Sequence, residues 1–139
     1  MSSIRVLLVD DNPKFIAAAA HFLATLPGIV LVGCSLSAQE GLTQIATLQP
    51  DLILMDIAMP RLNGFEATRQ IKFQANSPRV VILTMYDMPE YRAAAERVGA
   101  DGFIPKSDFG TKLPALVQAM FDKQPMTLTS SKNGWHITT

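Results

Sequence analysis

Residues 51–66 read DLILMDIAMPRLNGFE, and a run of four apolar residues in this stretch leads directly into the carboxylate of Asp56. An unbroken apolar run is typical of a strand that is buried on both faces, as the strands of a parallel sheet are. Pro60 and Gly64 follow at positions that suit a turn and the start of a helix. A carboxylate at the end of such a strand either marks the point where the chain reaches water or is placed there to react.

Similar apolar runs alternate with segments of helical length along most of the chain. The five expected strands cover residues 4–10, 29–34, 51–55, 79–84 and 101–106. The five expected helices cover residues 13–26, 38–48, 64–73, 89–99 and 111–121, with Pro114 in the first turn of the last one. This alternation with short connections predicts an α/β fold, a doubly wound five-stranded parallel sheet with helices on both faces.

The composition is that of one ordinary domain. With 139 residues, 48% of them hydrophobic, the chain can bury a core without disulfides or metal. Lysine plus arginine equals aspartate plus glutamate at 12 each, so direct nucleic-acid binding is not expected. The single cysteine, Cys34, is expected to be a packed thiol. The sequence has neither a signal peptide nor an apolar run of about 20 residues, which predicts a cytoplasmic protein outside the membrane.

Polar or charged residues that could take part in chemistry follow or close four of the five expected strands. Asp10 and Asp11 follow the first, Asp56 the third, Thr84 closes the fourth and Lys106 closes the fifth. Ligand sites in open parallel sheets lie at the carboxyl ends of the strands. If the strand order is 2-1-3-4-5, these four strands are neighbours and the five side chains converge on one crevice.

Three carboxylates in one crevice repel one another unless a cation lies between them. A donor set of oxygens without His or Cys favours Mg²⁺ over zinc. Mg²⁺ leaves room for Asp56 to act as a nucleophile toward a phosphoryl group, which would form an aspartyl phosphate. The hydroxyl of Thr84 and the ammonium of Lys106 could then stabilise the phosphoryl oxygens.

At these residues the chain resembles the receiver domains of bacterial two-component response regulators. The match covers residues 4–122 and rests on Asp10, Asp11, Asp56, the MP and NG pairs at 59–60 and 63–64, Thr84 and Lys106. The stretches DDNPKF and LTMYDMPEYRAAAERVGADGFIPKSD resemble the subgroup whose receivers precede a LuxR-type helix-turn-helix domain. The strand order 2-1-3-4-5 of the flavodoxin-like receiver fold is taken from this resemblance.

The resemblance implies a function and a site. A sensor histidine kinase would donate the phosphoryl group to Asp56, with Mg²⁺ bound by Asp10, Asp11, Asp56 and the backbone carbonyl of Ala58. Thr84 and Phe103 would reorient on phosphorylation and alter the face made by the fourth and fifth helices and the fifth strand. That face would bind a downstream effector or a second copy in a homodimer. The domain would be a signalling phosphoacceptor that catalyses its own phosphorylation and dephosphorylation, not an enzyme with a separate substrate.

Each of these residues also has a structural explanation when it is taken alone. Asp10 and Asp56 could simply end strands, Thr84 could be an ordinary strand threonine, and Lys106 could be a solvated surface charge. An aromatic residue in a strand, such as Phe103, usually packs in the hydrophobic core. The occurrence of the reactive residues together at four strand ends argues against these separate explanations.

Two other classes of protein share parts of this pattern. A flavodoxin-type electron carrier would have a Ser/Thr/Gly-rich phosphate loop where this chain has the charged stretch DDNPKF, and a bound yellow chromophore would identify it. A phosphatase with an aspartyl nucleophile would need an acid two residues after Asp56, where this chain has Ala58. Steady-state turnover of a phosphate ester would support the phosphatase. The absence of a polar side chain at Ala58 also predicts slow self-dephosphorylation of the receiver.

The domain organisation follows from the extent of the resemblance. Residues 1–122 are expected to be the receiver domain, and residues 123–139 a polar C-terminal tail or truncated linker. The tail lacks an evident packing pattern, so it is expected to be loosely held unless Trp135 docks. The favoured interpretation is the receiver part of a transcriptional regulator, and the alternative is a stand-alone receiver. No DNA binding is expected from this chain by itself.

Overall fold

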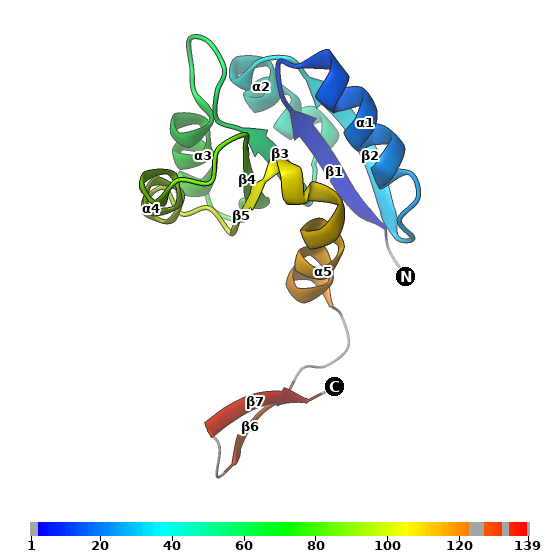
Figure 1. Cartoon of the computed structure of the whole chain (residues 1–139), viewed down its shortest axis with the longest axis vertical. Helices are drawn as coiled ribbons and strands as arrows, with labels where there is room; N and C mark the ends of the chain where they lie inside the picture. The colour runs from blue at the N-terminus through cyan, green and yellow to red at the C-terminus, as the bar shows by residue number, and fades with distance from the viewer. Residues whose placement is uncertain (1–2, 123–126, 132–133, 139) are drawn as a thin grey trace.

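A parallel sheet of five strands forms the centre of the molecule. The computed structural model describes residues 3–122, 127–131 and 134–138. The strands are β1 (Ile4–Val9), β2 (Ile29–Ser35), β3 (Leu52–Asp56), β4 (Arg79–Thr84) and β5 (Gly102–Pro105). Their order is β2-β1-β3-β4-β5 and every neighbouring pair is parallel, which confirms the predicted fold class. The arrowheads of β1 and β3 point to the same end of the sheet in Figure 1.

Helices cover both faces of the sheet, as predicted. They are α1 (Pro13–Leu23), α2 (Ala38–Leu48), α3 (Gly64–Phe73), α4 (Pro89–Arg97) and α5 (Phe109–Phe121), and a 3-10 turn, Lys106–Asp108, precedes α5. Side chains of α1 and α5 pack on one face, and side chains of α2, α3 and α4 pack on the other. Figure 1 shows α5 in front of the sheet.

Alternation along the strands divides the core into two layers. In β1, Val6 and Leu8 contact the layer of α1 and α5, whereas Leu7 and Val9 contact the opposite layer, and all four are 0% exposed. Because both faces are buried, the strand is apolar at every one of these positions. This is the physical reason for the continuous apolar runs in the sequence.

A side-chain cap begins α1 where the sequence predicts it. The Asn12 side chain accepts hydrogen bonds from the amides of Lys14 and Phe15, and Pro13 occupies the first turn of α1. Helix α1 ends at Leu23, three residues earlier than expected. The following residues form tight turns instead, in which the Thr25 amide and hydroxyl both bond to the carbonyl of Phe22.

The start of α5 differs from the prediction. The helix begins at Phe109 and not at residue 111, so Pro114 lies inside it and beyond its first turn. Proline has no amide hydrogen, and the carbonyl of Gly110 therefore lacks its usual helical partner. Gly110 is exposed, so water can bind that carbonyl. The prediction that Pro114 lies in the first turn is wrong.

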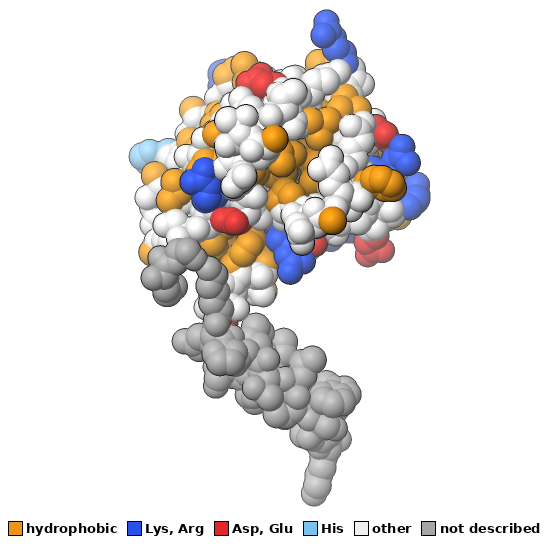
Figure 2. Space-filling model, turned by 180° about the vertical axis from the view of Figure 1, so that it is seen from behind, with side chains coloured by type: hydrophobic (Ala, Val, Ile, Leu, Met, Phe, Trp, Pro, Cys, Tyr) orange, Lys and Arg blue, Asp and Glu red, His pale blue; other side chains and the backbone are white. Residues whose placement is uncertain are grey.

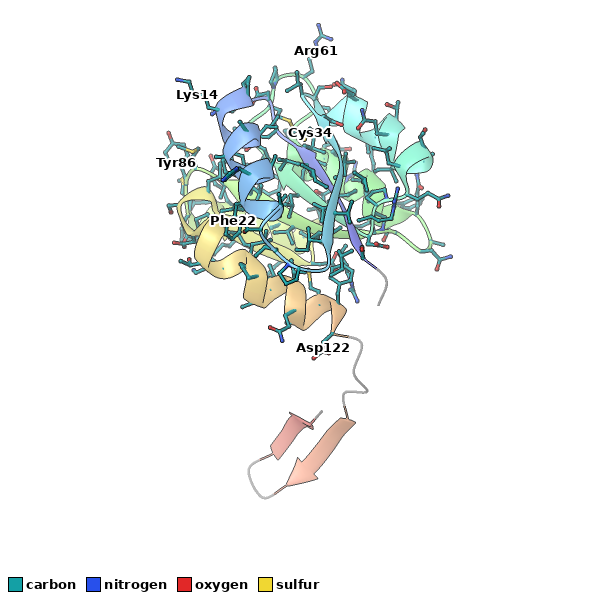
Figure 3. All side chains as sticks on the ribbon, turned by 90° about the vertical axis from the view of Figure 1, so that its right-hand side faces the viewer. Lys14, Phe22, Cys34, Arg61, Tyr86 and Asp122 are labelled. Carbon is teal, nitrogen blue, oxygen red and sulfur yellow. The ribbon has the colours of Figure 1, made fainter. Side chains whose placement is uncertain are left out.

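Two other expectations are also corrected. Cys34 is exposed on β2, which is an edge strand, and it is not a packed thiol. Figure 3 shows the labelled Cys34 on that strand on the side that faces the viewer. In the tail, β6 (Thr127–Ser131) and β7 (Gly134–Thr138) pair as an antiparallel hairpin that the sequence analysis did not predict. The environment of the Trp135 side chain lies outside the described part of the chain.

Charged side chains of both signs are dispersed over the face behind that of Figure 1. Figure 2 shows them separated by uncharged and hydrophobic side chains, in agreement with the balanced composition of 12 basic and 12 acidic residues. Within the described ranges, no helix combines the length and the apolar character needed to cross a membrane.

Candidate functional site

Asp10 lies directly after β1 and is completely buried. The amide of Asn12 donates to Asp10 Oδ1 at 2.8 Å, and the Asn12 side chain in turn caps α1. One short turn therefore orients the buried carboxylate and begins the helix. Asp11, between them, is exposed at the surface of the same site.

Asp56 is the last residue of β3 and is 3% exposed. The backbone after it turns closely against the start of α3, because a Cβ atom on Gly64 would lie 2.2 Å from the Asp56 carbonyl oxygen. Only glycine permits this approach. Asn63 caps α3 by accepting a hydrogen bond from the Glu66 amide at 2.9 Å. The NG pair of the sequence thus holds the loop that follows Asp56.

Lys106 brings a positive charge between the two buried acids. Its side chain is 8% exposed, and its Nζ atom lies 2.6 Å from Asp10 Oδ2 and 3.5 Å from Asp56 Oδ1. Within the described residues, Asp10 Oδ2 is buried without a well-directed hydrogen bond, so the short contact with Lys106 is an ion pair only. The sequence prediction that these three residues converge is correct in its geometry.

Thr84 closes β4 and is 2% exposed. Its hydroxyl donates to the Tyr86 carbonyl and accepts from the Tyr86 amide, at 3.1 Å in both cases. Asp56 pairs with Leu83, so Thr84 lies one residue beyond it along the neighbouring strand. The hydroxyl therefore lies at the same end of the sheet as Asp56, but it is hydrogen-bonded to the backbone of the loop that follows β4.

The three carboxylates form a candidate cation site. Asp10, Asp11 and Asp56 each offer an oxygen, and these oxygens lie within 4.8 Å of one another. Burial raises the pKa of Asp56, and Asp10 and Asp11 raise it further, whereas Lys106 and a hydrogen bond from the Ala58 amide act in the opposite direction. The excess of negative charge and the oxygen-only donors fit a hard divalent cation such as Mg²⁺.

Phe103 lies on β5, half buried, beside the layer of α2, α3 and α4. The guanidinium of Arg92 stacks on it, with Cζ 4.7 Å from the ring centroid. Arg92 also binds Asp87 through two hydrogen bonds of 2.6 and 2.9 Å. Phe103 was expected from the sequence, but its two partners were not, because contacts between a loop, a helix and a strand leave no short motif.

A second aromatic contact was also missed. The Lys106 Nζ atom lies 4.4 Å from the centroid of the Phe15 ring. Phe15 belongs to the DDNPKF stretch, on which the resemblance to receivers partly rests, but the sequence did not predict a place for its ring at the site. Nothing in the sequence pairs Phe15 with a lysine 91 positions later.

Comparison with known proteins identifies the class to which this fold and site belong. The response regulator receiver domain family matches residues 6–118, and the chain belongs to this family. It is 34% identical over 117 residues to response regulator GacA of Pseudomonas viridiflava, an alignment that covers 84% of this chain and 53% of GacA. It is 30% identical over 122 residues to the transcriptional regulatory protein LiaR of Bacillus subtilis, covering 88% of this chain and 58% of LiaR.

A solved structure agrees with the same family. A LuxR-family two-component response regulator from an Aurantimonas species superposes with a TM-score of 0.81 at 28% identity, over 88% of each chain. The predicted resemblance to receivers of the LuxR-type subgroup is therefore confirmed. The chain spans about half the length of the two curated relatives that it matches.

Proposed function

We propose that Asp56 is the phosphoacceptor and that a sensor histidine kinase in the cytoplasm supplies its phosphoryl group. The observation that carries this proposal is the meeting of Asp56 with Asp10 and the buried Lys106 ammonium at one end of the sheet. A nucleophile, a cation site and a cationic donor are the groups that phosphoryl transfer requires. With these residues the domain would catalyse its own phosphorylation and dephosphorylation at Asp56.

Mg²⁺ is the cation that this donor set fits. Asp10, Asp11 and Asp56 would hold it, together with the backbone carbonyl of Ala58. When bound, Mg²⁺ would neutralise negative charge on the carboxylates and on the phosphoryl oxygens. Burial raises the pKa of Asp56 first, and repulsion from Asp10 and Asp11 raises it further. A bound cation would relieve this repulsion, which supports a cation at the three carboxylates.

The residues of the chain divide the transfer step between them. A carboxylate oxygen of Asp56 attacks phosphorus, the bond from phosphorus to the kinase histidine nitrogen breaks, and that nitrogen keeps the electron pair. Lys106 turns from its ion pair with Asp10 toward a phosphoryl oxygen. The Thr84 hydroxyl leaves the Tyr86 carbonyl and donates to another phosphoryl oxygen.

The movement of Thr84 links the chemistry to the surface. Its two hydrogen bonds with Tyr86 would break, and the loop between β4 and α4 would be free to shift. Phe103 lies close to this loop through Arg92 and Asp87, and we expect it to reorient with Thr84. The face of α4, β5 and α5 would then bind a downstream effector or a second copy.

The domain assignment completes the proposal. Residues 1–122 would form the receiver, and residues 123–139 a tail or truncated linker. LiaR is a transcriptional regulatory protein and the Aurantimonas structure is that of a LuxR-family response regulator. The likeness to both supports a receiver of a transcriptional regulator, with a stand-alone receiver as the alternative. Contact with DNA would then be made by another domain and not by this chain.

Phosphorylation can be tested directly with the purified chain. Incubation with Mg²⁺ and acetyl phosphate should add the mass of one phosphoryl group to the wild type, and none to an Asp56→Asn variant or in excess chelator. Asp51→Asn is a matched control, because Asp51 lies just before the same strand but is exposed at its other end. A phosphoryl group that adds equally to the Asp56→Asn variant would contradict the assignment.

A further inference from the structure

The Lys106 ammonium is enclosed by two kinds of neighbour, acidic and aromatic. Asp10 Oδ2 lies 2.6 Å away and Asp56 Oδ1 lies 3.5 Å away. The Phe15 ring faces the same Nζ atom at 4.4 Å from its centroid. An ammonium has three N–H groups. Because the Lys106 side chain is only 8% exposed, an N–H group that does not point to either acid has little access to water. The face of the ring is a suitable partner for this positive charge.

The Phe15 ring is held in place by other rings. It packs edge to face against Phe109, with centroids 5.5 Å apart and planes at 70°. Phe109 is 6% exposed and packs in the same way against Phe22 at 5.8 Å. Phe109 is the first residue of α5, which follows Lys106 after the 3-10 turn. The ring and the lysine are therefore fixed by the same junction between β5 and α5.

The turn after β1 fixes the ring from the other side. Asn12 accepts a hydrogen bond from the Phe15 amide at 3.4 Å, and the Asn12 amide donates to Asp10 at 2.8 Å. Asp10 and Phe15 thus belong to one hydrogen-bonded turn, with the Lys106 ammonium in contact with both. A movement of the turn would carry the acid and the ring together.

We propose that Phe15 is a positioning residue for Lys106, holding the ammonium through the face of its ring while the lysine exchanges Asp10 for the phosphoryl group. This inference rests on the proposed phosphorylation of Asp56. When Lys106 turns to a phosphoryl oxygen, its contact with Asp10 weakens, but the ring still supports the charge and excludes water. The lysine then reaches the phosphoryl group in one orientation and without a hydration shell.

The test compares two leucine variants that each remove one ring from the same cluster. Phe15→Leu should slow phosphorylation by acetyl phosphate about three- to tenfold at saturating Mg²⁺, as expected for loss of a partly desolvated cation–π contact. Phe22→Leu, which removes a ring with no contact to Lys106, should stay within about twofold of the wild type. Phe15→Tyr, which keeps an aromatic ring at this position, should be phosphorylated at the wild-type rate. Mg²⁺ affinity, measured by titration calorimetry, should be unchanged in both leucine variants.

Ring electronics provide a second measurement that does not depend on packing. Phenylalanine at position 15 is replaced by residues with one, two and three ring fluorines, which keep the shape but weaken the negative potential of the ring face. The rate should fall stepwise with fluorination. A rate that does not change along this series, or an equal loss in Phe15→Leu and Phe22→Leu, would overturn the positioning role.

The same experiment separates this inference from the proposed function. If the wild type and the Phe15 variants are phosphorylated at Asp56 at equal rates, the positioning role fails and the phosphoacceptor stands. If the wild type itself takes up no phosphoryl group with Mg²⁺, the proposed function fails, and the inference fails with it.

Discussion

The two ends of the sheet each carry a carboxylate that is largely removed from water, and their surroundings are opposite. At the amino end, Asp101 accepts hydrogen bonds from Lys72 at 2.9 Å, from the Val80 amide at 2.8 Å and from Arg79 at 3.3 Å. Burial alone would raise the pKa of Asp101, but the Lys72 and Val80 hydrogen bonds outweigh it, so the pKa is lowered. This carboxylate is fully supported by its partners.

At the carboxyl end, Asp56 lacks that support. Burial raises its pKa first and the neighbouring Asp10 raises it further, against Lys106 at 3.5 Å and the Ala58 amide. In the described part of the chain, one lysine serves the two buried acids of this site. The contrast teaches that a satisfied carboxylate holds strands and helices together, whereas an unsatisfied one is available for a cation and for chemistry.

The largest effect on stability is expected from Asp101. Replacement by Asn should lower the free energy of unfolding by about 2 to 3 kcal/mol, because it removes the charge that holds Lys72 and Arg79 while leaving both cations in place. Urea denaturation would measure this loss. Glu66→Gln is the control, since Glu66 pairs with Arg69 on the surface and should matter little. Equal stability of the two variants would break the comparison.

The opposite sign is expected at Asp56. Without Mg²⁺, Asp56→Asn should raise the melting temperature by a few degrees, the shift expected when the free energy of unfolding rises by about 1 kcal/mol. The reason is that the substitution removes a negative charge that is buried beside Asp10. Added Mg²⁺ should stabilise the wild type and have a smaller effect on the variant. Calorimetric scans with and without Mg²⁺ would measure both effects, and a lower melting temperature for Asp56→Asn in the absence of Mg²⁺ would contradict the comparison.

The two carboxylates should also respond to pH with opposite signs. The contribution of Asp101 is fully present above the unfolded pKa of about 3.9 and is lost as the pH falls through its lower folded pKa. For Asp56 the folded pKa is the higher one, so the native state binds the proton more tightly. Stability should therefore fall as the pH rises from about 3.9 through the raised pKa of Asp56.

Urea titrations from acid to neutral pH in the absence of Mg²⁺ would reveal this difference. As the pH rises, Asp56→Asn should become increasingly more stable than the wild type. Over the same range, Asp101→Asn should become increasingly less stable than the wild type. Parallel profiles for the two variants would mean that the two ends of the sheet are electrostatically alike.

The smallest effect on stability is expected at Ala58, which is exposed beside the site. Ala58→Asn should leave the free energy of unfolding within about 0.5 kcal/mol of the wild type. It should nevertheless shorten the lifetime of phosphorylated Asp56 several-fold, because a polar side chain there can hold a water. Loss of the phosphoryl group can be followed by intact mass after removal of the donor. A half-life of seconds for the wild type itself would contradict the slow rate predicted from Ala58.

Much of the fold was predictable because the central strands β1, β3 and β4 are largely buried on both faces, and because α1, α2 and α3 begin at side-chain caps. Strand β4 and helices α2 and α3 have the predicted bounds, since apolar runs, Ser37 and Asn63 mark them locally. The start of α5 was less predictable, because the 3-10 turn at Lys106–Asp108 leads straight into it. The exposure of Cys34 depends on β2 being an edge strand, which the residues around it do not reveal.

Residue types and their order along the chain were sufficient to indicate an α/β receiver with a candidate site at Asp10, Asp11, Asp56, Thr84 and Lys106, because strand ends are local features. Tertiary structure alone showed which of these groups are in contact: Lys106 lies closer to Asp10 than to Asp56, and Thr84 is bonded to Tyr86. It alone brought Phe15 to Lys106 and Arg92 to Phe103. These contacts join residues on different strands and helices, and packing of the whole sheet and its helices, not local sequence, sets the distances between them.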